Sequence, residues 1–70
     1  MGINAKRIKN LDNLLKYAND KGWTAHLDQS GYDKEWRCYL FPAKGGGMIM
    51  GESKPTPYTA LKDALSKINL

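Results

Sequence analysis

The 70-residue chain contains only one cysteine and one histidine. One thiol cannot form an internal disulfide, and one Cys with one His cannot supply the ligands of a structural zinc site. A lone thiol is typical of a reducing compartment, so we expect a cytoplasmic protein that holds no metal and no other cofactor.

Long apolar runs are also missing. The apolar segments are too short to cross a bilayer, and the first residues lack the charged-then-apolar pattern of a secretory signal, so we expect no membrane association. The proportions of hydrophobic (41%), charged (26%) and aromatic (10%) residues are typical of folded globular proteins. The length predicts one small domain over residues 1–70, which buries only about 60% of its unfolded surface.

The apolar spacing predicts a helix near residues 4–21. Apolar residues recur at three- and four-residue spacing and fall within about 120° of arc on a helix. They are Ile8, Leu11, Leu14, Leu15 and Ala18. Asn4 and Asn10 are both candidate N-caps, and Gly22 can close the helix in a left-handed conformation.

After Gly22 the hydrophobic period changes to two, which predicts strands. Apolar side chains alternate with polar ones, first at Trp23, Ala25 and Leu27, then at Trp36, Cys38 and Leu40. Pro42 ends the second strand, residues 44–47 form a hairpin loop, and residues 48–52 form a short third strand. Loops this short connect antiparallel strands.

Thr56 and Pro57 give the clearest start signal in the chain, an N-cap followed by proline at the first helical position. An apolar stripe follows and predicts a helix over residues 56–68. We therefore predict an α+β fold of order α-β-β-β-α, with a three-stranded antiparallel sheet and two helices packed on one face. The predicted core brings together Leu15, Trp36, Leu40, Leu61 and Leu65.

Residue combinations that support catalysis are absent. Cys38 and His26 fall on opposite faces of the predicted sheet, so they cannot form a nucleophilic dyad. The glycine-rich segment 46–54 has Glu52 after Gly51, where a phosphate-binding loop needs lysine. A pocket of ~300 Å³ or more would consume much of so small a core. We predict that the protein is not an enzyme.

One face of the predicted sheet has no helix to cover it. The more apolar strand residues face the helices, which leaves Thr24, His26, Arg37, Tyr39 and Phe41 on the other side. Such a face can stack nucleic-acid bases or bury a protein partner. The alternative is that these side chains pack against one another, the N-terminal residues or a loop.

The charge is positive and uneven. Eleven basic and seven acidic residues give a net charge of +4 and a pI near 9.3. Residues 1–22 contain five basic and two acidic side chains, whereas residues 23–42 contain two and three. A basic first helix, with Lys44 and Lys54, can follow a phosphate backbone. Charge on one helix face also serves simple solvation.

The element order resembles the double-stranded-RNA-binding domain. The local matches are residues 14–18 in the first helix, 30–36 between the first two strands, 51–54 before the last helix, and Ala64-Leu65. The chain departs from the family at its RNA contacts. Lys16 replaces an acidic residue, Lys34 replaces a loop histidine, and only Lys54 remains of a lysine cluster that holds phosphates across the major groove.

A second resemblance covers the same span. Trp23, Trp36, Gly51-Glu52 and the Thr56-Pro57 helix start are similar to features of small phage and prophage proteins that have a sheet-and-helices sandwich. This resemblance implies a genomic setting more than an activity.

These features predict a non-catalytic binding module, with nucleic acid, RNA or DNA, as the leading partner. The candidate contact residues are Lys6, Lys9, Lys16, Arg37, Tyr39, Phe41, Lys44 and Lys54. The lysines would contact phosphates, and Tyr39 and Phe41 would stack on bases. The alternative is a phage-type accessory protein that docks on a host protein, for example a host-defence inhibitor, through Arg37, Tyr39 and Phe41. The sequence leaves the oligomeric state open.

Overall fold

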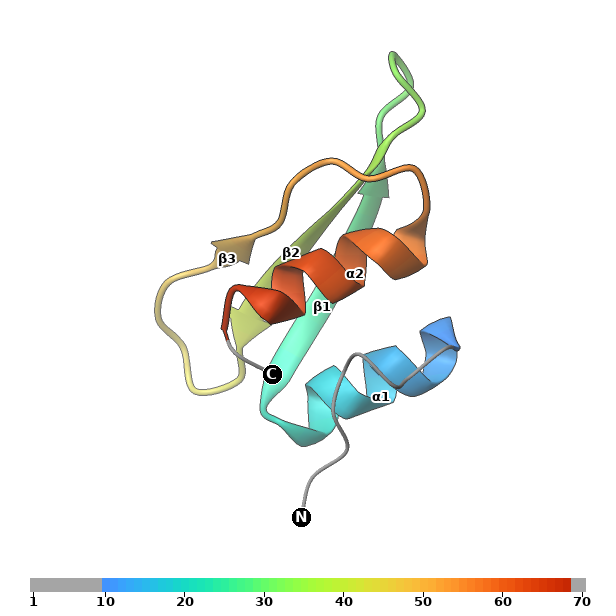
Figure 1. Ribbon diagram of the computed structural model, residues 1–70. Coiled ribbons are helices and arrows are strands. Elements are labelled where there is room, and N and C mark those ends of the chain that lie inside the picture. Colours follow the sequence, from blue (N-terminus) through green and yellow to red (C-terminus); the bar gives the residue numbers. More distant parts are fainter. Residues whose placement is uncertain (1–9, 69–70) are drawn as a thin grey trace.

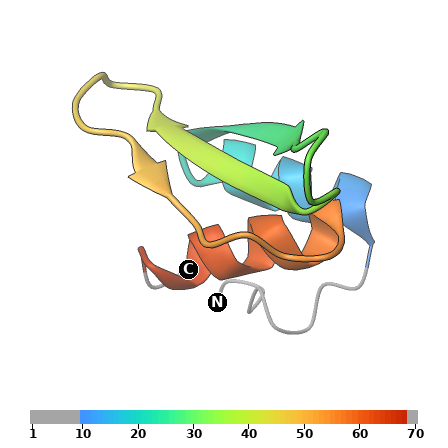
Figure 2. The same ribbon diagram turned by 90° about the horizontal axis from the view of Figure 1, so that it is seen from above.

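The protein consists of two layers, a three-stranded sheet and a pair of helices on one of its faces (Figures 1 and 2). The computed structural model describes residues 10–68. The elements are α1 (Leu11–Asp20), β1 (Trp23–Gln29), β2 (Trp36–Pro42), β3 (Ile49–Met50) and α2 (Pro57–Ser66). The predicted order and the antiparallel sheet are confirmed.

Helix α1 begins at Leu11 because Asn10 caps it. Asn10 is extended (φ −110°, ψ 133°), and its side-chain oxygen accepts hydrogen bonds from the backbone N–H groups of Asp12 (2.8 Å) and Asn13 (3.4 Å). Of the two candidate caps, Asn10 is therefore the one that starts α1. The predicted residues 4–9 of this helix lie outside the described residues. Gly22 follows the helix with φ 89°, the predicted left-handed conformation.

Helix α2 begins with a reciprocal cap, as predicted. The Thr56 hydroxyl accepts a hydrogen bond from the backbone N–H of Thr59 (3.1 Å), and the Thr59 hydroxyl accepts one from the N–H of Thr56 (3.3 Å). Two N–H groups without helical partners are thus satisfied at the helix start. The helix ends at Ser66, two residues before the predicted end.

Strand β3 is much shorter than the predicted 48–52, because a bulge interrupts its pairing with β2. The N–H of Gly51 still donates to the carbonyl oxygen of Cys38 (3.0 Å), and Trp36 and Lys54 exchange two backbone hydrogen bonds (2.6 and 2.8 Å). The two residues between Gly51 and Lys54 therefore lie opposite Arg37 alone. One extra residue on one strand is a β-bulge, which bends the strand and ends regular pairing.

The core lies between the sheet and the helices. Its fully buried members are Leu14, Ala18, Cys38, Leu40, Ala60, Leu61, Ala64 and Leu65. Of the predicted core, Leu40, Leu61 and Leu65 are fully buried, whereas Leu15 and Trp36 are partly buried and pack against the cluster. The assignment of the two sheet faces is confirmed, because Leu40 and Cys38 face the helices.

Candidate binding face

Within residues 10–68 no helix covers the sheet face opposite α1 and α2, and we call it the outer face. It is formed by side chains that alternate with the buried strand residues: Thr24, His26, Asp28, Arg37, Tyr39, Phe41 and Met50. In the register, Tyr39 lies between His26 of β1 and Met50 of β3, and Phe41 lies opposite Thr24. Both helices lie on the other side of the sheet (Figure 2). Phe41 is 40% exposed and Met50 is 55% exposed.

Aromatic side chains on the outer face partly pack against one another. The rings of His26 and Phe41 meet edge to face, with centroids 5.0 Å apart and an interplanar angle of 79°. These residues are diagonal neighbours on paired strands, a spacing that aromatic side chains can bridge. The expectation of mutual packing therefore holds for this pair, yet Phe41 remains 40% exposed.

The end of the outer face next to the loop between β1 and β2 is acidic. The Arg37 guanidinium lies 3.7 Å from the Asp33 carboxylate, and Asp28 is paired with Arg37 in the register. The pKa of Asp33 is held below its ordinary value chiefly by a 2.9 Å hydrogen bond from the backbone N–H of Glu35, with a further contribution from Arg37. The positive charge of Arg37 is therefore largely balanced, and this end offers little attraction to a phosphate.

Lys44 lies at the opposite end, in the loop that follows β2. Its side chain is exposed, and within residues 10–68 no carboxylate lies within ion-pair distance of its ammonium. Lys54 differs, because its Nζ lies 4.0 Å from the Asp63 carboxylate, which Lys67 also approaches at 3.9 Å. Lys44 therefore follows the end of β2 by two residues and has no competing carboxylate in the described chain, whereas Lys54 has one.

The predicted basic helix and the aromatic face do not form one surface. Lys16 is exposed on α1, two residues after the buried Leu14, so its side chain points away from the core on the helix side of the molecule. Tyr39 and Phe41 point the opposite way. Lys6 and Lys9 lie outside the described residues. The structure therefore groups Arg37, Tyr39 and Phe41, separates Lys16 and Lys54 from them, and places Lys44 at the end of the sheet with Trp23 and Pro42.

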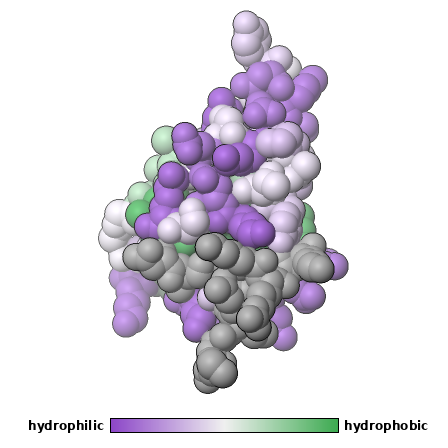
Figure 3. All heavy atoms as spheres, in the orientation of Figure 1, coloured by the Kyte–Doolittle hydropathy of each residue, from purple (hydrophilic) through white to green (hydrophobic). Residues whose placement is uncertain are grey.

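Charge within the described chain is nearly balanced. Three of the eleven basic residues, Lys6, Arg7 and Lys9, belong to residues 1–9, which leaves eight basic and seven acidic side chains in residues 10–68. The helix side is largely hydrophilic in the coloured part of Figure 3. Helix α1 itself contains one basic residue, Lys16, and two acidic residues, Asp12 and Asp20, so it does not produce a strong positive field.

Met50 belongs to the outer face but was not among the predicted contacts. The face of a strand this short is set by its register with β2, where Met50 pairs with Tyr39. The alternation of a partly buried Ile49 with an exposed Met50 is too brief to give a period on its own. The antiparallel order of the strands could have predicted this placement, because a residue of β3 that is paired with Tyr39 lies on the same face as Tyr39.

Comparison with models of protein families, with curated protein sequences and with solved structures finds no match for this chain. Neither of the two helices in the described part of the chain is long and apolar enough to cross a membrane.

Proposed function

We propose that the protein is a non-catalytic module that binds single-stranded nucleic acid across the outer face. The supporting observation is a row of partly exposed aromatic rings on the outer face, together with a lysine at the end of the sheet that has no acidic partner in the described chain. Tyr39 and Phe41 stack on bases, His26 supports the ring of Phe41, and Lys44 meets the phosphate backbone. Such stacking contributes about 1–3 kcal/mol per base and tolerates any base sequence. In keeping with the single thiol at Cys38, a cytoplasmic location is part of this proposal.

A single strand suits this face better than a duplex. A duplex hides the flat faces of its bases, whereas a single strand can splay them onto aromatic side chains. Duplex binding in the manner of the double-stranded-RNA-binding domain would use Lys16 and Lys54 instead. Lys54 is already ion-paired with Asp63. The resemblance to that family therefore remains a proposal about the fold and favours no duplex contact.

Fluorescence anisotropy with labelled single-stranded and duplex oligonucleotides, at low and moderate salt, tests this function. Phe41→Ala and Tyr39→Ala should each weaken single-strand binding by about tenfold, the lower part of the stacking range. Tyr32→Ala is the matched control, because Tyr32 is 97% exposed at the hairpin tip and does not belong to the outer face. Absence of binding at low salt, or equal affinity for all three variants, would rule the proposal out.

Exposed methionines favour a second candidate, docking on a protein, as in a phage-type accessory protein that binds a host protein. Met50 is 55% exposed beside Tyr39, and Met48 is 47% exposed just before β3. Methionine and aromatic side chains are enriched at adaptable protein interfaces. Protein docking predicts that a partner captured from nuclease-treated lysate is lost with Met50→Lys and kept with Lys44→Gln. Capture that disappears on nuclease treatment would argue against it.

A further inference from the structure

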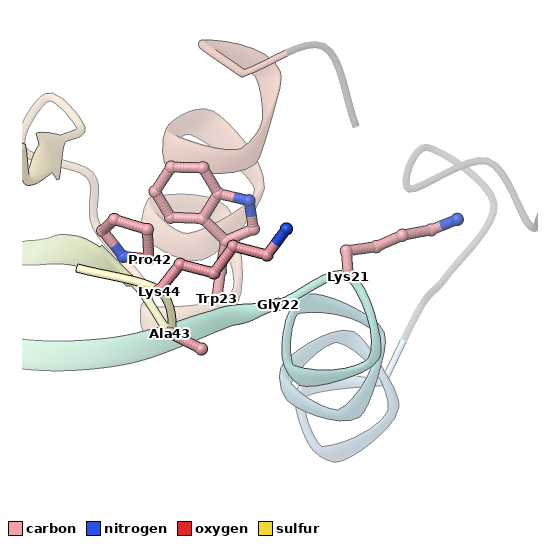
Figure 4. Close-up of a pocket in the computed structure, with 6 residues that line it drawn as sticks. All are labelled: Lys21, Gly22, Trp23, Pro42, Ala43 and Lys44. Carbon is pink, nitrogen blue, oxygen red and sulfur yellow. The ribbon is translucent and has the colours of Figure 1, made fainter. Parts of the chain in front are cut away.

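A pocket of about 290 Å³ lies at the end of the sheet, where β1 begins and β2 ends (Figure 4). Its lining residues are Lys21, Gly22, Trp23, Pro42, Ala43 and Lys44. Two features position these residues. Trp23 and Pro42 are paired in the β1–β2 register, and the N–H of Ala43 donates to the carbonyl oxygen of Gly22 (2.8 Å). The pocket is therefore built on paired backbone and not on a free loop alone.

The pocket combines a flat apolar surface with positive charge. Figure 4 shows the Pro42 ring and the Lys44 side chain beside the indole of Trp23, whereas Lys21 points away from the indole. The Lys21 ammonium lies 5.7 Å from the centroid of the Tyr17 ring, so it is held by α1. None of the lining residues is acidic. Lys44 is therefore the cation best placed to meet an anion in this pocket.

These properties define the class of ligand. A planar ring can stack on the Trp23 indole, and an attached anionic group can reach the Lys44 ammonium. A volume near 290 Å³ is at the small end of ligand pockets, which start at about 300 Å³, so it suits one nucleotide and excludes a duplex. Phe41 and Pro42 point to opposite faces of the sheet, so a strand that lies on the outer face has to turn around the end of β2 to reach the pocket.

We propose that this pocket binds one nucleotide that has a terminal phosphate, with its base on Trp23 and its phosphate at Lys44. The nucleotide is either a free mononucleotide or the phosphorylated end of a strand that lies on the outer face. The strand-end form rests on the proposed function, whereas the free form does not. Both ligands place a base on Trp23 and a phosphate at Lys44, and they differ only in whether a nucleic-acid strand continues from the sugar.

The test is a titration of isotope-labelled protein with adenosine monophosphate, followed by the Trp23 indole N–H and the backbone amides of Gly22 and Ala43. Adenosine and inorganic phosphate are the probes that lack one half of the ligand. Adenosine monophosphate should move these resonances at concentrations about tenfold lower than adenosine, because a hydrogen bond to a charged group is lost without the phosphate. Inorganic phosphate alone should leave the indole unmoved.

Lys44→Gln should weaken binding of adenosine monophosphate about tenfold, by the same charged contact. Lys62→Gln is the matched control, since Lys62 is on α2 and does not line the pocket. Equal affinity in these two variants, or unmoved pocket resonances at millimolar adenosine monophosphate, would overturn the inference. Trp23→Leu, which removes the stacking surface, should abolish the response at Gly22 and Ala43, and a retained response would also contradict it.

Oligonucleotides separate this inference from the proposed function. Phe41→Ala should weaken oligonucleotide binding and leave adenosine monophosphate binding unchanged. Oligonucleotide binding without any pocket response to adenosine monophosphate refutes the inference and leaves the proposed function standing. A pocket response to adenosine monophosphate without oligonucleotide binding refutes only the function. Tighter binding of a 5′- or 3′-phosphorylated oligonucleotide than of its unphosphorylated form supports the strand end. Equal binding of these forms, with a response to adenosine monophosphate, supports the free nucleotide.

Discussion

Replacing Gly51 by alanine tests the contact between the end of β3 and helix α2. Gly51 is buried, and a Cβ added there would lie 3.1 Å from the Cβ of Ala64, 3.1 Å from its backbone nitrogen and 3.1 Å from the Asp63 carboxylate. Carbon atoms in good contact are about 3.5–4.0 Å apart. The Ala64 atoms belong to the helix and cannot rotate away, so the added methyl group has to push α2 from the sheet.

The magnitude follows from a comparison with Gly47→Ala. Gly47 has open space around its Cβ position and does not need a left-handed φ. Alanine at either site lowers the entropy of the unfolded chain, which stabilises the protein by about 0.4–1 kcal/mol. At Gly51 overpacking adds a cost of about 1–3 kcal/mol. The free energy of unfolding of Gly51→Ala should therefore lie about 1–3 kcal/mol below that of Gly47→Ala.

Urea unfolding monitored by tryptophan fluorescence measures this difference directly. Both variants should show the m-value of the original protein, so that the difference reflects stability and not compactness. In thermal unfolding the difference corresponds to about 4–8 °C per kcal/mol for a domain of this size. Unfolding free energies that agree to within about 0.5 kcal/mol, the usual scatter for surface changes, would show that α2 does not approach Gly51 this closely.

Two further substitutions and the behaviour of the Cys38 thiol test the fold. Leu61→Ala should lower the free energy of unfolding by about 2–5 kcal/mol, because Leu61 is fully buried, and a melting temperature within a degree or two of the original would contradict this placement. Thr56→Ala should cost about 0.5–2 kcal/mol by removing the cap of α2, and unchanged urea unfolding would show that the cap is not formed. Burial raises the pKa of Cys38 from 9.0 to about 11, so the thiol should resist alkylation near pH 8 until the protein unfolds. The same shift makes stability fall as pH rises from about 9 to 11, and rapid labelling of the folded protein would contradict the burial.

Much of the fold followed from local signals in the sequence. The change of period after Gly22 separated helix from strand, and Thr56-Pro57 located the start of α2. The two candidate caps of α1 could not be ranked from the sequence, since Asn4 and Asn10 have the same chemistry. Only the extended backbone at Asn10 and its hydrogen bonds to the first turn select it as the cap of α1.

Features that depend on the pairing register of the strands could not be predicted from the hydrophobic pattern of the sequence. The bulge opposite Arg37 shortens β3. A single extra residue in so short a strand cannot be detected from the alternation of apolar and polar residues. The pocket depends on the pairing of Trp23 with Pro42, which brings Lys44 to the indole. The separation of Lys16 from Phe41, in contrast, follows from the predicted fold itself, because both helices lie on one side of the sheet and Phe41 points to the other.

Chemical-shift mapping with a single-stranded oligonucleotide at low salt tests the use of the outer face most directly. Isotope-labelled protein is titrated with oligodeoxythymidine, and both backbone and aromatic resonances are followed. We expect the largest changes at Tyr39 and Phe41, a smaller one at His26, and none on α1 around Lys16. Changes concentrated on α1, with the outer face unmoved, would contradict the account.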